Sequence, residues 1–412
     1  MEIGSIIRTA RISKRITQEE LAHGICSISH LSKIENGSRE GNEETIKLLL
    51  DKLNIHISQY KEEYKYFLQL IDDWYQAIVY EDFEDAKNKY NFLKENQQIV
   101  TSIHLYNYYS IVEYRYFLSL NDKVKYKYIR KILLKKTKKF SQYEFALFTY
   151  YNGIYYLKGG DVDPAHVILN KLIDKNFNHY GELYYHYAYT MKLLKNYGAS
   201  ILYCNKALEI FNTHNNFKKK MHTQMLIANN YQKIGAVKDS EEHYNILLKN
   251  AIRLKNDPTI AITYHNIAHL KKVSNNYKEA IDLFENSIKY FRKSETSYLQ
   301  SLCDLAEVYL LIGDKEKFFE LYNQILQLAR QEKNKQIEKQ YYIKNKFYTS
   351  TLEEFANFFT AIQMDTLLNF ELLNDVILYS EALISFYRDK KDMQNQIKYL
   401  ELVNRLYKSK YT

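Results

Sequence analysis

Three neighbouring side chains near the N-terminus, Ile28, Ser29 and Lys33, are of types that can contact the edges of DNA bases. A lysine can donate to guanine, a serine hydroxyl can donate or accept, and an isoleucine can pack against the methyl group of thymine. These side chains read a base sequence only if a helix presents them together in the major groove. Such a reading face requires flanking residues that start, end and support a short helix.

The flanking residues carry the signals that start and end two short helices. Thr17 and Glu20 form a capping-box pattern, in which each side chain accepts from the backbone amide of the other residue. Ser27 is a favourable N-cap for the next helix, which Gly37 would end. Gly24 lies in the turn between the helices, where a residue without a Cβ atom is favoured. In this order and spacing, the signals predict a helix-turn-helix.

Residues 3–55 resemble the helix-turn-helix of the XRE/Cro phage-repressor family. In that family the third helix enters the major groove, and the first residues of the second and third helices contact phosphates. The resemblance implies phosphate contacts from Gln18, Ser27 and Asn36, and base contacts from Ile28, Ser29 and Lys33. Arg11 and Glu35 match a pair that joins the first and third helices of the family, and we interpret them as a structural salt bridge.

Charge limits how this domain can bind DNA. Residues 1–55 carry equal numbers of basic (Lys, Arg) and acidic (Asp, Glu) residues, although the whole chain has a net charge of +9. A neutral module gains little from phosphate attraction. We therefore expect a homodimer that binds two half-sites of double-stranded DNA about one helical turn apart.

The composition of the remainder indicates an all-α protein. The 412 residues include only 2 prolines and 11 glycines, and the stretches between them show no strand-like alternation. No apolar run approaches the roughly 18 residues that suggest a membrane-spanning helix, and the N-terminus has no secretory segment. Cys26, Cys204 and Cys303 form no CxxC pair. These features predict a reduced, cytoplasmic location and no cysteine-held metal.

A repeat pattern of the tetratricopeptide type begins after a connector near residues 56–59. Ala228 lies seven residues before a turn at Gly235, and Ala306 lies seven before Gly313. The period exceeds the usual ~34 residues, so longer helices are expected. Equivalent positions in the second helices are Ala86, Tyr126, Ala165, Ser200, Ser240, Ala280, Phe318, Ala356 and Gln396. We predict a helix-turn-helix domain over 1–58, followed over 59–412 by about nine helical pairs in a right-handed α-solenoid.

The first helix of each pair lines the inner surface of a tetratricopeptide solenoid, and here that surface carries amide, aromatic and imidazole side chains. The candidates are Asn152, Tyr189, His222, Asn229, Gln232, His265, Asn266 and His269. An amide can donate to a peptide main chain and accept from it at once, so this lining indicates a peptide receptor; solvated helix faces are the alternative. His265 and His269 have the i, i+4 spacing of a metal pair. Because no third ligand or HExxH pattern accompanies them, we predict no metal and no other cofactor.

The segment 123–139 carries nine lysines and arginines and no acid. As a helix it would present Val124, Tyr128 and Ile132 on one side and lysines on the others. It could contact DNA beside the operator, an acidic protein partner or a membrane surface. The alternative is a solvated repeat face.

A repressor-like helix-turn-helix followed by a tetratricopeptide solenoid resembles the RRNPP family of peptide-pheromone receptors, and residues 26–37 are similar to its PlcR and NprR branch. The resemblance implies a cytoplasmic quorum-sensing transcription regulator that is switched by a short peptide. It also implies that inner-helix asparagines clamp the peptide backbone, which agrees with Asn229. Two alternatives stay open: an adaptor that sequesters a phosphorelay protein, and a repressor that needs no ligand. The sequence shows no nucleophile elbow, phosphate loop or catalytic dyad, so we do not expect an enzyme.

Overall fold

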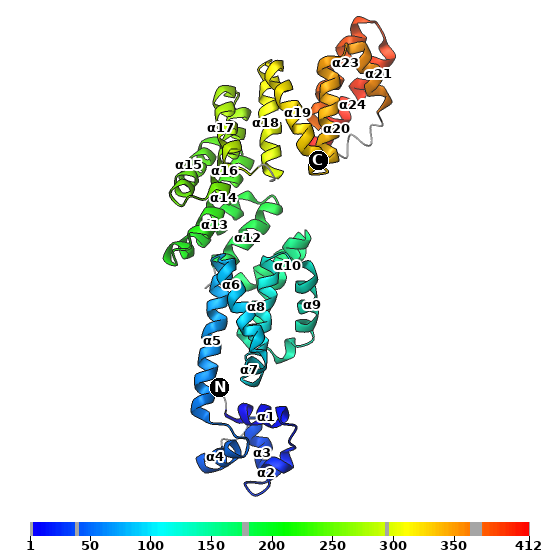
Figure 1. The fold of residues 1–412 in the computed structure, drawn as a ribbon. Helices are drawn as coiled ribbons and strands as arrows, with labels where there is room; N and C mark the ends of the chain where they lie inside the picture. The colour runs from blue at the N-terminus through cyan, green and yellow to red at the C-terminus, as the bar shows by residue number, and fades with distance from the viewer. Residues whose placement is uncertain (1–2, 38–40, 175–180, 293–295, 363–372, 412) are drawn as a thin grey trace. The chain divides into compact units, whose positions relative to one another are not determined.

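The computed structural model describes residues 3–37, 41–174, 181–292, 296–362 and 373–411, and Figure 1 traces them along the chain. Within these ranges the regular structure is helical and no strand occurs. The all-α prediction is confirmed. None of the helices in this part of the chain combines the length and the apolar character needed to cross a bilayer.

The helix-turn-helix domain consists of α1 (Ile3–Ser13), α2 (Gln18–Ala22), α3 (Ile28–Glu35) and α4 (Glu43–Lys52). The predicted capping box is present, since the Thr17 amide donates to the Glu20 carboxylate over 2.6 Å and the Glu20 amide donates to the Thr17 hydroxyl over 3.1 Å. Gly24 has a φ of 78°, which glycine adopts without strain. The helices enclose a small aliphatic core that includes Ile7, Leu21, Leu31, Ile34 and Leu49.

The chain passes from this domain into α5 (Ile57–Val79) through a connector that differs from the expected one. α4 ends at Lys52 and α5 begins at Ile57, so Gln59 belongs to the first turn of α5 and not to the connector. The boundary predicted between residues 58 and 59 lies inside that turn. The 23 residues of α5 form one helix that begins beside the DNA-binding domain and ends at Val79.

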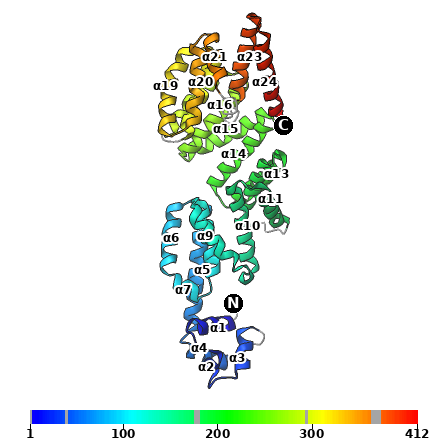
Figure 2. The ribbon, with the colours of Figure 1, turned by 90° about the vertical axis from the view of Figure 1, so that its right-hand side faces the viewer.

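The rest of the described chain forms nine helical pairs, with a short helix α7 (Gln97–Ser102) and a 3-10 turn at Thr137–Lys139 between them. Figure 2 shows these pairs from a second direction. The pairs are α5 with α6 (Phe83–Glu95), α8 (Tyr106–Ser119) with α9 (Lys123–Leu134), α10 (Gln142–Gly159) with α11 (Val162–Asp174), α12 (Gly181–Leu193) with α13 (Tyr197–Thr213), α14 (Phe217–Lys233) with α15 (Val237–Arg253), α16 (Asp257–Val273) with α17 (Tyr277–Tyr290), α18 (Thr296–Leu311) with α19 (Lys315–Gln331), α20 (Lys335–Thr349) with α21 (Leu352–Ala361), and α23 (Leu373–Asp389) with α24 (Met393–Tyr411).

Small buried residues near the start of the second helices let the two helices of a pair cross closely. The predicted positions Ala86, Ala165, Ser200, Ser240 and Ala280 are all fully buried. The Ser200 hydroxyl donates to the carbonyl of Ala188 over 2.6 Å, and the Ser240 hydroxyl donates to that of Ala228 over 2.9 Å. The same hydrogen bond therefore recurs in consecutive repeats. Of the other predicted positions, Tyr126, Phe318 and Ala356 are buried and Gln396 is half-buried.

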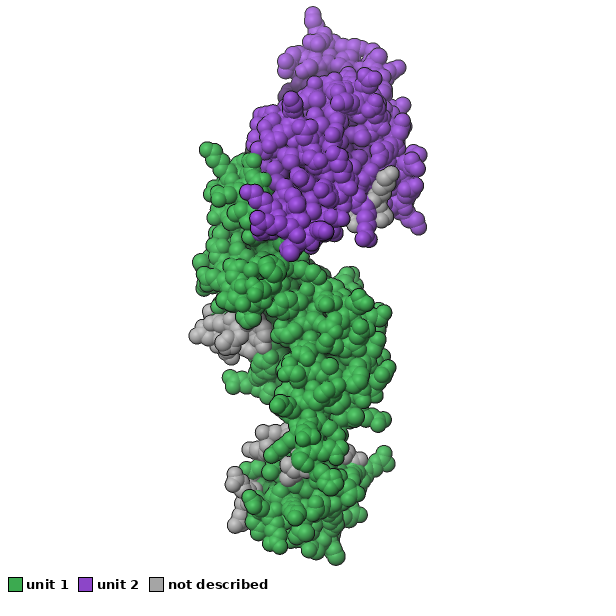
Figure 3. All heavy atoms as spheres, turned by 60° about the vertical axis from the view of Figure 1, so that its left-hand side comes forward, with its two compact units in different colours: residues 1–247 green, residues 248–412 purple. Residues whose placement is uncertain are grey.

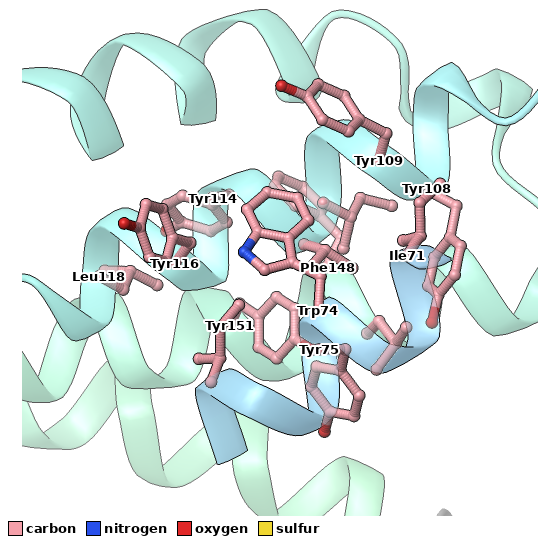
Figure 4. Close-up of a cluster of buried hydrophobic side chains, with 14 of the residues drawn as sticks. Ile71, Trp74, Tyr75, Tyr108, Tyr109, Tyr114, Tyr116, Leu118, Phe148 and Tyr151 are labelled. Carbon is pink, nitrogen blue, oxygen red and sulfur yellow. The ribbon is translucent and has the colours of Figure 1, made fainter. Parts of the chain in front are cut away.

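The chain divides into two compact units, residues 1–247 and 248–412 (Figure 3). Each unit contains buried hydrophobic clusters of its own. In the first unit Trp74 is fully buried and packs against Tyr109 and Tyr116, with ring centroids 5.6 Å apart in both pairs (Figure 4). In the second unit one cluster contains Phe318 and another contains Phe355.

Candidate functional sites

The exposed face of α3 brings the predicted base-reading residues together. Ser27 caps the helix by accepting from the His30 amide over 3.1 Å. Ile28 is 47% exposed although it is aliphatic, and Ser29 and Lys33 are exposed one turn apart. Leu31 and Ile34, on the opposite side of α3, are buried in the domain core. The arrangement suits a reading helix, and the contacts of these residues with DNA stay a prediction.

Arg11 and Glu35 form the predicted salt bridge between α1 and α3. The Arg11 Nε atom lies 2.7 Å from Glu35 Oε1, and its Nη2 atom donates to Glu35 Oε2 over 3.0 Å. The hydrogen bonds that Arg11 donates to Glu35 raise the pKa of Arg11 above its ordinary value. Gln18 also donates to Glu35 Oε2 over 2.7 Å, so this carboxylate fixes the side chain at the start of α2. The phosphate contact predicted for Gln18 would be made from this fixed position.

A second polar pair of this domain, Arg8 with Asn36, was not predicted. Arg8 Nη1 donates to Asn36 Oδ1 over 2.9 Å, and both residues are exposed. The contact orients the amide of Asn36, a predicted phosphate ligand, and places a guanidinium beside it. The three-residue spacing of Arg8 and Arg11 on α1 could have pointed to this role, because such residues share one face of a helix.

The candidate peptide-binding residue Asn229 lies half-buried on α14. Its Oδ1 atom accepts from the Tyr244 hydroxyl over 2.5 Å, and the same hydroxyl lies 3.5 Å from Oε1 of Gln232. Tyr244 is fully buried on α15. No described residue accepts from the Asn229 amide nitrogen, so Tyr244 holds the amide by its oxygen and leaves its donor group available. Sequence reasoning missed Tyr244, because it belongs to a second helix and only the first helices were expected to line the inner surface.

Two other candidates of the first unit have different surroundings. Asn152 is 8% exposed; its Oδ1 accepts from Arg130 over 2.7 Å, and its Nδ2 donates to the Phe148 carbonyl over 2.9 Å. Both ends of this amide make hydrogen bonds within the fold, and its contact with a peptide stays a prediction. Tyr189 is 37% exposed, with the Lys192 ammonium 5.8 Å from its ring centroid.

His222, also on α14, joins a network of ionic side chains that sequence reasoning missed. Its Nδ1 atom lies 3.6 Å from Oε1 of Glu81, which lies 2.8 Å from the ammonium of Lys219. The same ammonium lies 3.1 Å from Oε1 of Glu182, which also binds Arg115 over 2.9 Å. We call these five residues the ionic cluster. Because 138 residues separate Glu81 from Lys219, no local pattern could have indicated it.

Opposite charges set the ionisation states of the ionic cluster. Burial alone would raise the pKa of Glu182, but Arg115 and Lys219 outweigh it and lower the value to about 2. Burial lowers the pKa of His222, and the carboxylate of Glu81 opposes this effect. The carboxylates are therefore ionised at neutral pH. The cluster joins the turn after α5 to α8, α12 and α14 through charge-assisted hydrogen bonds.

The remaining candidates, His265, Asn266 and His269, lie half-buried on α16 in the second unit. His265 Nδ1 lies 2.9 Å from the Ser301 hydroxyl, and its Nε2 lies 3.7 Å from Oδ2 of Asp304. Burial lowers the pKa of His265, which favours the neutral imidazole. Lys272 pairs with Asp304 over 3.2 Å and with Glu307. In the described part of the chain no three histidine, cysteine or acidic side chains gather in a way that could hold a metal ion.

Both predicted types of element match known families. Residues 7–60 match the helix-turn-helix family. Residues 181–214 and 259–331 match tetratricopeptide-repeat families.

Similar proteins span nearly the whole chain. The transcriptional activator NprA of Geobacillus stearothermophilus is 25% identical over 411 residues, which cover 95% of this chain and 98% of NprA. The apo form of the quorum sensor NprR from B. thuringiensis has the same fold, with a TM-score of 0.73 and 20% identity over 83% of this chain and 99% of that one. NprR in complex with its cognate peptide NprX gives a TM-score of 0.56 and 21% identity over 82% and 97% of the two chains.

Proposed function

We propose that this chain, a homologue of the transcriptional activator NprA with the domain organisation of the RRNPP regulators, is a cytoplasmic transcription regulator whose DNA binding is switched by a short signalling peptide. The observation that carries the proposal is the match to NprA across 95% of the chain, because it includes both the helix-turn-helix and the repeats.

The DNA-binding half of the proposal rests on α3. Its exposed face offers a donor (Lys33), a hydroxyl (Ser29) and an apolar contact (Ile28) to the major groove. Asn36 and Arg8 would contact phosphates beside it. Because the domain is neutral, a homodimer with two such faces is needed to reach specific affinity.

The peptide-binding half rests on α14. Asn229 is held by Tyr244 through its oxygen, so its amide nitrogen can donate to a peptide carbonyl without a cost in side-chain entropy. Gln232, one turn further, shares the same tyrosine. The structurally similar NprR has been solved with its cognate peptide NprX, and the fold of the repeats is the same. We infer that a peptide backbone lies along the inner surface at α14.

The ionic cluster would couple peptide binding at α14 to DNA binding by the helix-turn-helix domain. Lys219 and His222 lie on α14, the helix that carries Asn229, and both approach Glu81, which follows the end of α5. The Lys218 ammonium also donates to the Glu81 carbonyl over 3.1 Å, and the Tyr80 hydroxyl donates to the His214 carbonyl over 2.8 Å. A shift of α14 on peptide binding would therefore move the far end of α5, the helix that follows the DNA-binding domain.

The test is fluorescence anisotropy of the full-length protein on labelled duplexes from upstream and downstream of its own gene. Synthetic peptides from the C-terminus of a small neighbouring reading frame are added, and Asn229→Ala is measured beside the wild type. We expect a peptide-dependent shift in DNA affinity that requires more peptide in Asn229→Ala. DNA binding that no peptide changes would contradict the switch and leave a ligand-independent repressor.

A second candidate function, docking of an acidic protein partner, is favoured by the exposed lysines of α9. Lys123, Lys127 and Lys131 are exposed there, and Lys135, which directly follows α9, is exposed as well. Pull-down with a chain lacking residues 1–60 would support this adaptor role if capture fails when these lysines are changed to glutamine. Capture that persists in the glutamine variant would contradict it.

A further inference from the structure

A cavity of about 90 Å³ lies in the first unit, where the last turns of α5 meet α12 and α13. α5 contributes Tyr75 and Val79 to its lining, α12 contributes Glu182, and α13 contributes Phe211. The lining includes none of the candidate DNA-binding or peptide-binding residues. We call it the α5 cavity.

The walls of the α5 cavity are mainly apolar. Tyr75 and Phe211 are buried, and Val79 is half-buried. The start of α12 fits against the ring of Phe211 because Gly181 has no side chain; a Cβ atom there would lie 2.7 Å from the ring. The exposed Gln76 also lines the cavity, which therefore opens to solvent on one side. An apolar cavity of about 150 Å³ can hold benzene, so the α5 cavity suits a smaller body.

Glu182 supplies this apolar cavity with one strong hydrogen-bond acceptor. The residue is 2% exposed. Its Oε1 atom accepts from Arg115 over 2.9 Å and from Lys219 over 3.1 Å, whereas Oε2 is buried and has no hydrogen-bond partner among the described residues. Although burial would raise the pKa of Glu182, Arg115 and Lys219 lower it to about 2, so the carboxylate can only accept at neutral pH. A buried acceptor without a donor costs free energy, which a donor bound in the cavity would recover.

The charges beside the α5 cavity already balance one another. The ionic cluster contains two carboxylates, Glu81 and Glu182, and two cations, Arg115 and Lys219. Burial lowers the pKa of His222, its fifth member, which favours the neutral imidazole. Arg115 and Lys219 would repel a cationic ligand, and Glu182 would repel an anionic one. The cavity therefore favours a neutral ligand.

We propose that the α5 cavity binds a small neutral ring compound with one N–H or O–H donor, its ring between Tyr75, Val79 and Phe211 and its donor on Oε2 of Glu182. Such a ligand would join α5 to α12 and α13 beside the ionic cluster. The site is separate from the peptide surface of α14, so it would give the protein a second, small-molecule input.

The experiment is a titration of the full-length protein with pyrrole, followed by ligand-observed NMR, which detects weak binding. Furan is titrated in parallel, because its ring has the same size but carries no donor. We expect saturable binding of pyrrole that is about tenfold tighter than that of furan, the effect of one hydrogen bond to a charged acceptor. Pyrrole should also raise the Tm more than furan, because a ligand that binds only the folded chain stabilises it.

Val79→Phe tests the place of binding, because the larger side chain fills the cavity from α5. We expect it to lower the affinity for pyrrole about tenfold. Val167→Phe is the matched control: it makes the same change on α11 at a residue that is 51% exposed and lies outside the cavity. This variant should bind pyrrole like the wild type.

Two kinds of result would overturn the proposal. Pyrrole affinity that falls equally in both variants, or in neither, would place binding outside the α5 cavity. Absence of saturable binding to the wild type, or equal binding of furan, would remove the role of Glu182 as acceptor. The comparison of pyrrole with furan uses the wild type, so it decides the matter even if Val79→Phe fails to fold.

Discussion

At the scale of single residues, Lys33 gives the sharpest test of DNA reading. It is exposed on α3, where a lysine can donate to guanine. Lys33→Ala should lower the affinity for operator DNA by about 1–3 kcal/mol and leave binding to a scrambled duplex nearly unchanged. Anisotropy on both duplexes measures the difference, with Lys47→Ala, an exposed lysine of α4, as the control. Equal losses on the two duplexes would assign Lys33 to a phosphate instead.

Glu182 makes a prediction about stability and pH. Its pKa in the folded protein is about 2, below the ordinary value of 4.5. A carboxylate with a lowered pKa contributes stability that is fully present above its unfolded pKa and is lost as the pH falls through its folded pKa. Glu182→Gln should therefore destabilise the protein by about 3 kcal/mol at neutral pH, and its difference from the wild type should shrink below about pH 4.

Urea unfolding from pH 7 down to pH 3 measures this difference. Glu209→Gln, which changes an exposed glutamate of α13, controls for the loss of one acid and should unfold like the wild type throughout. A constant difference between Glu182→Gln and the wild type across this pH range would mean that packing, and not ionisation, makes Glu182 important.

At the scale of elements, Tyr244 tests whether a second helix positions the peptide contact. Tyr244→Phe keeps the packing of α15 but removes the hydroxyl that holds Asn229. We expect peptide affinity to fall about fivefold, the effect of one net hydrogen bond. Tyr187→Phe removes a comparable hydroxyl, which donates to Asn170 over 2.7 Å, and should leave peptide affinity unchanged. If the two variants behave alike, Tyr244 has only a structural role.

The elements themselves were largely predictable from sequence, because their signals are local. Thr17 with Glu20 marked the start of α2, and small residues such as Ser200 and Ser240 marked close helix crossings that recur in several repeats. The side-chain environments were less predictable. Asn152 and Asn229 were both predicted to contact a peptide, yet Arg130 engages one and Tyr244 the other. That difference depends on which side chain a neighbouring helix presents.

Contacts between distant repeats were beyond sequence reasoning for a geometric reason. The pairs Arg115–Glu182 and Glu81–Lys219 bring together residues 67 and 138 positions apart. Such pairs meet only after the intervening helices have stacked, and each residue taken alone reads as a surface charge. A repeat pattern describes contacts between neighbouring repeats. It therefore predicts how the helices stack but not these ion pairs between distant repeats.

At the scale of the whole molecule, we expect the ion pairs between distant repeats to carry the effect of the repeats on DNA binding. Glu81 accepts from Lys219 of α14 and follows the last turn of α5, so it links the proposed peptide surface to the helix that follows the DNA-binding domain. Typical coupling between two binding sites amounts to about 1–3 kcal/mol, a 5- to 150-fold change in affinity. Glu81→Gln weakens the ion pair with Lys219 without changing the size of the side chain.

We expect Glu81→Gln to bind peptide and DNA separately with affinities close to those of the wild type, but to lose most of the peptide-induced change in DNA affinity. Anisotropy on operator DNA with and without saturating peptide gives the coupling directly. Asp85→Asn is the control, because it breaks an ion pair with Lys89 that lies within α6. Full coupling in Glu81→Gln would show that peptide acts on DNA through another contact, such as a rearranged dimer, since coupling requires an element whose state both ligands bias.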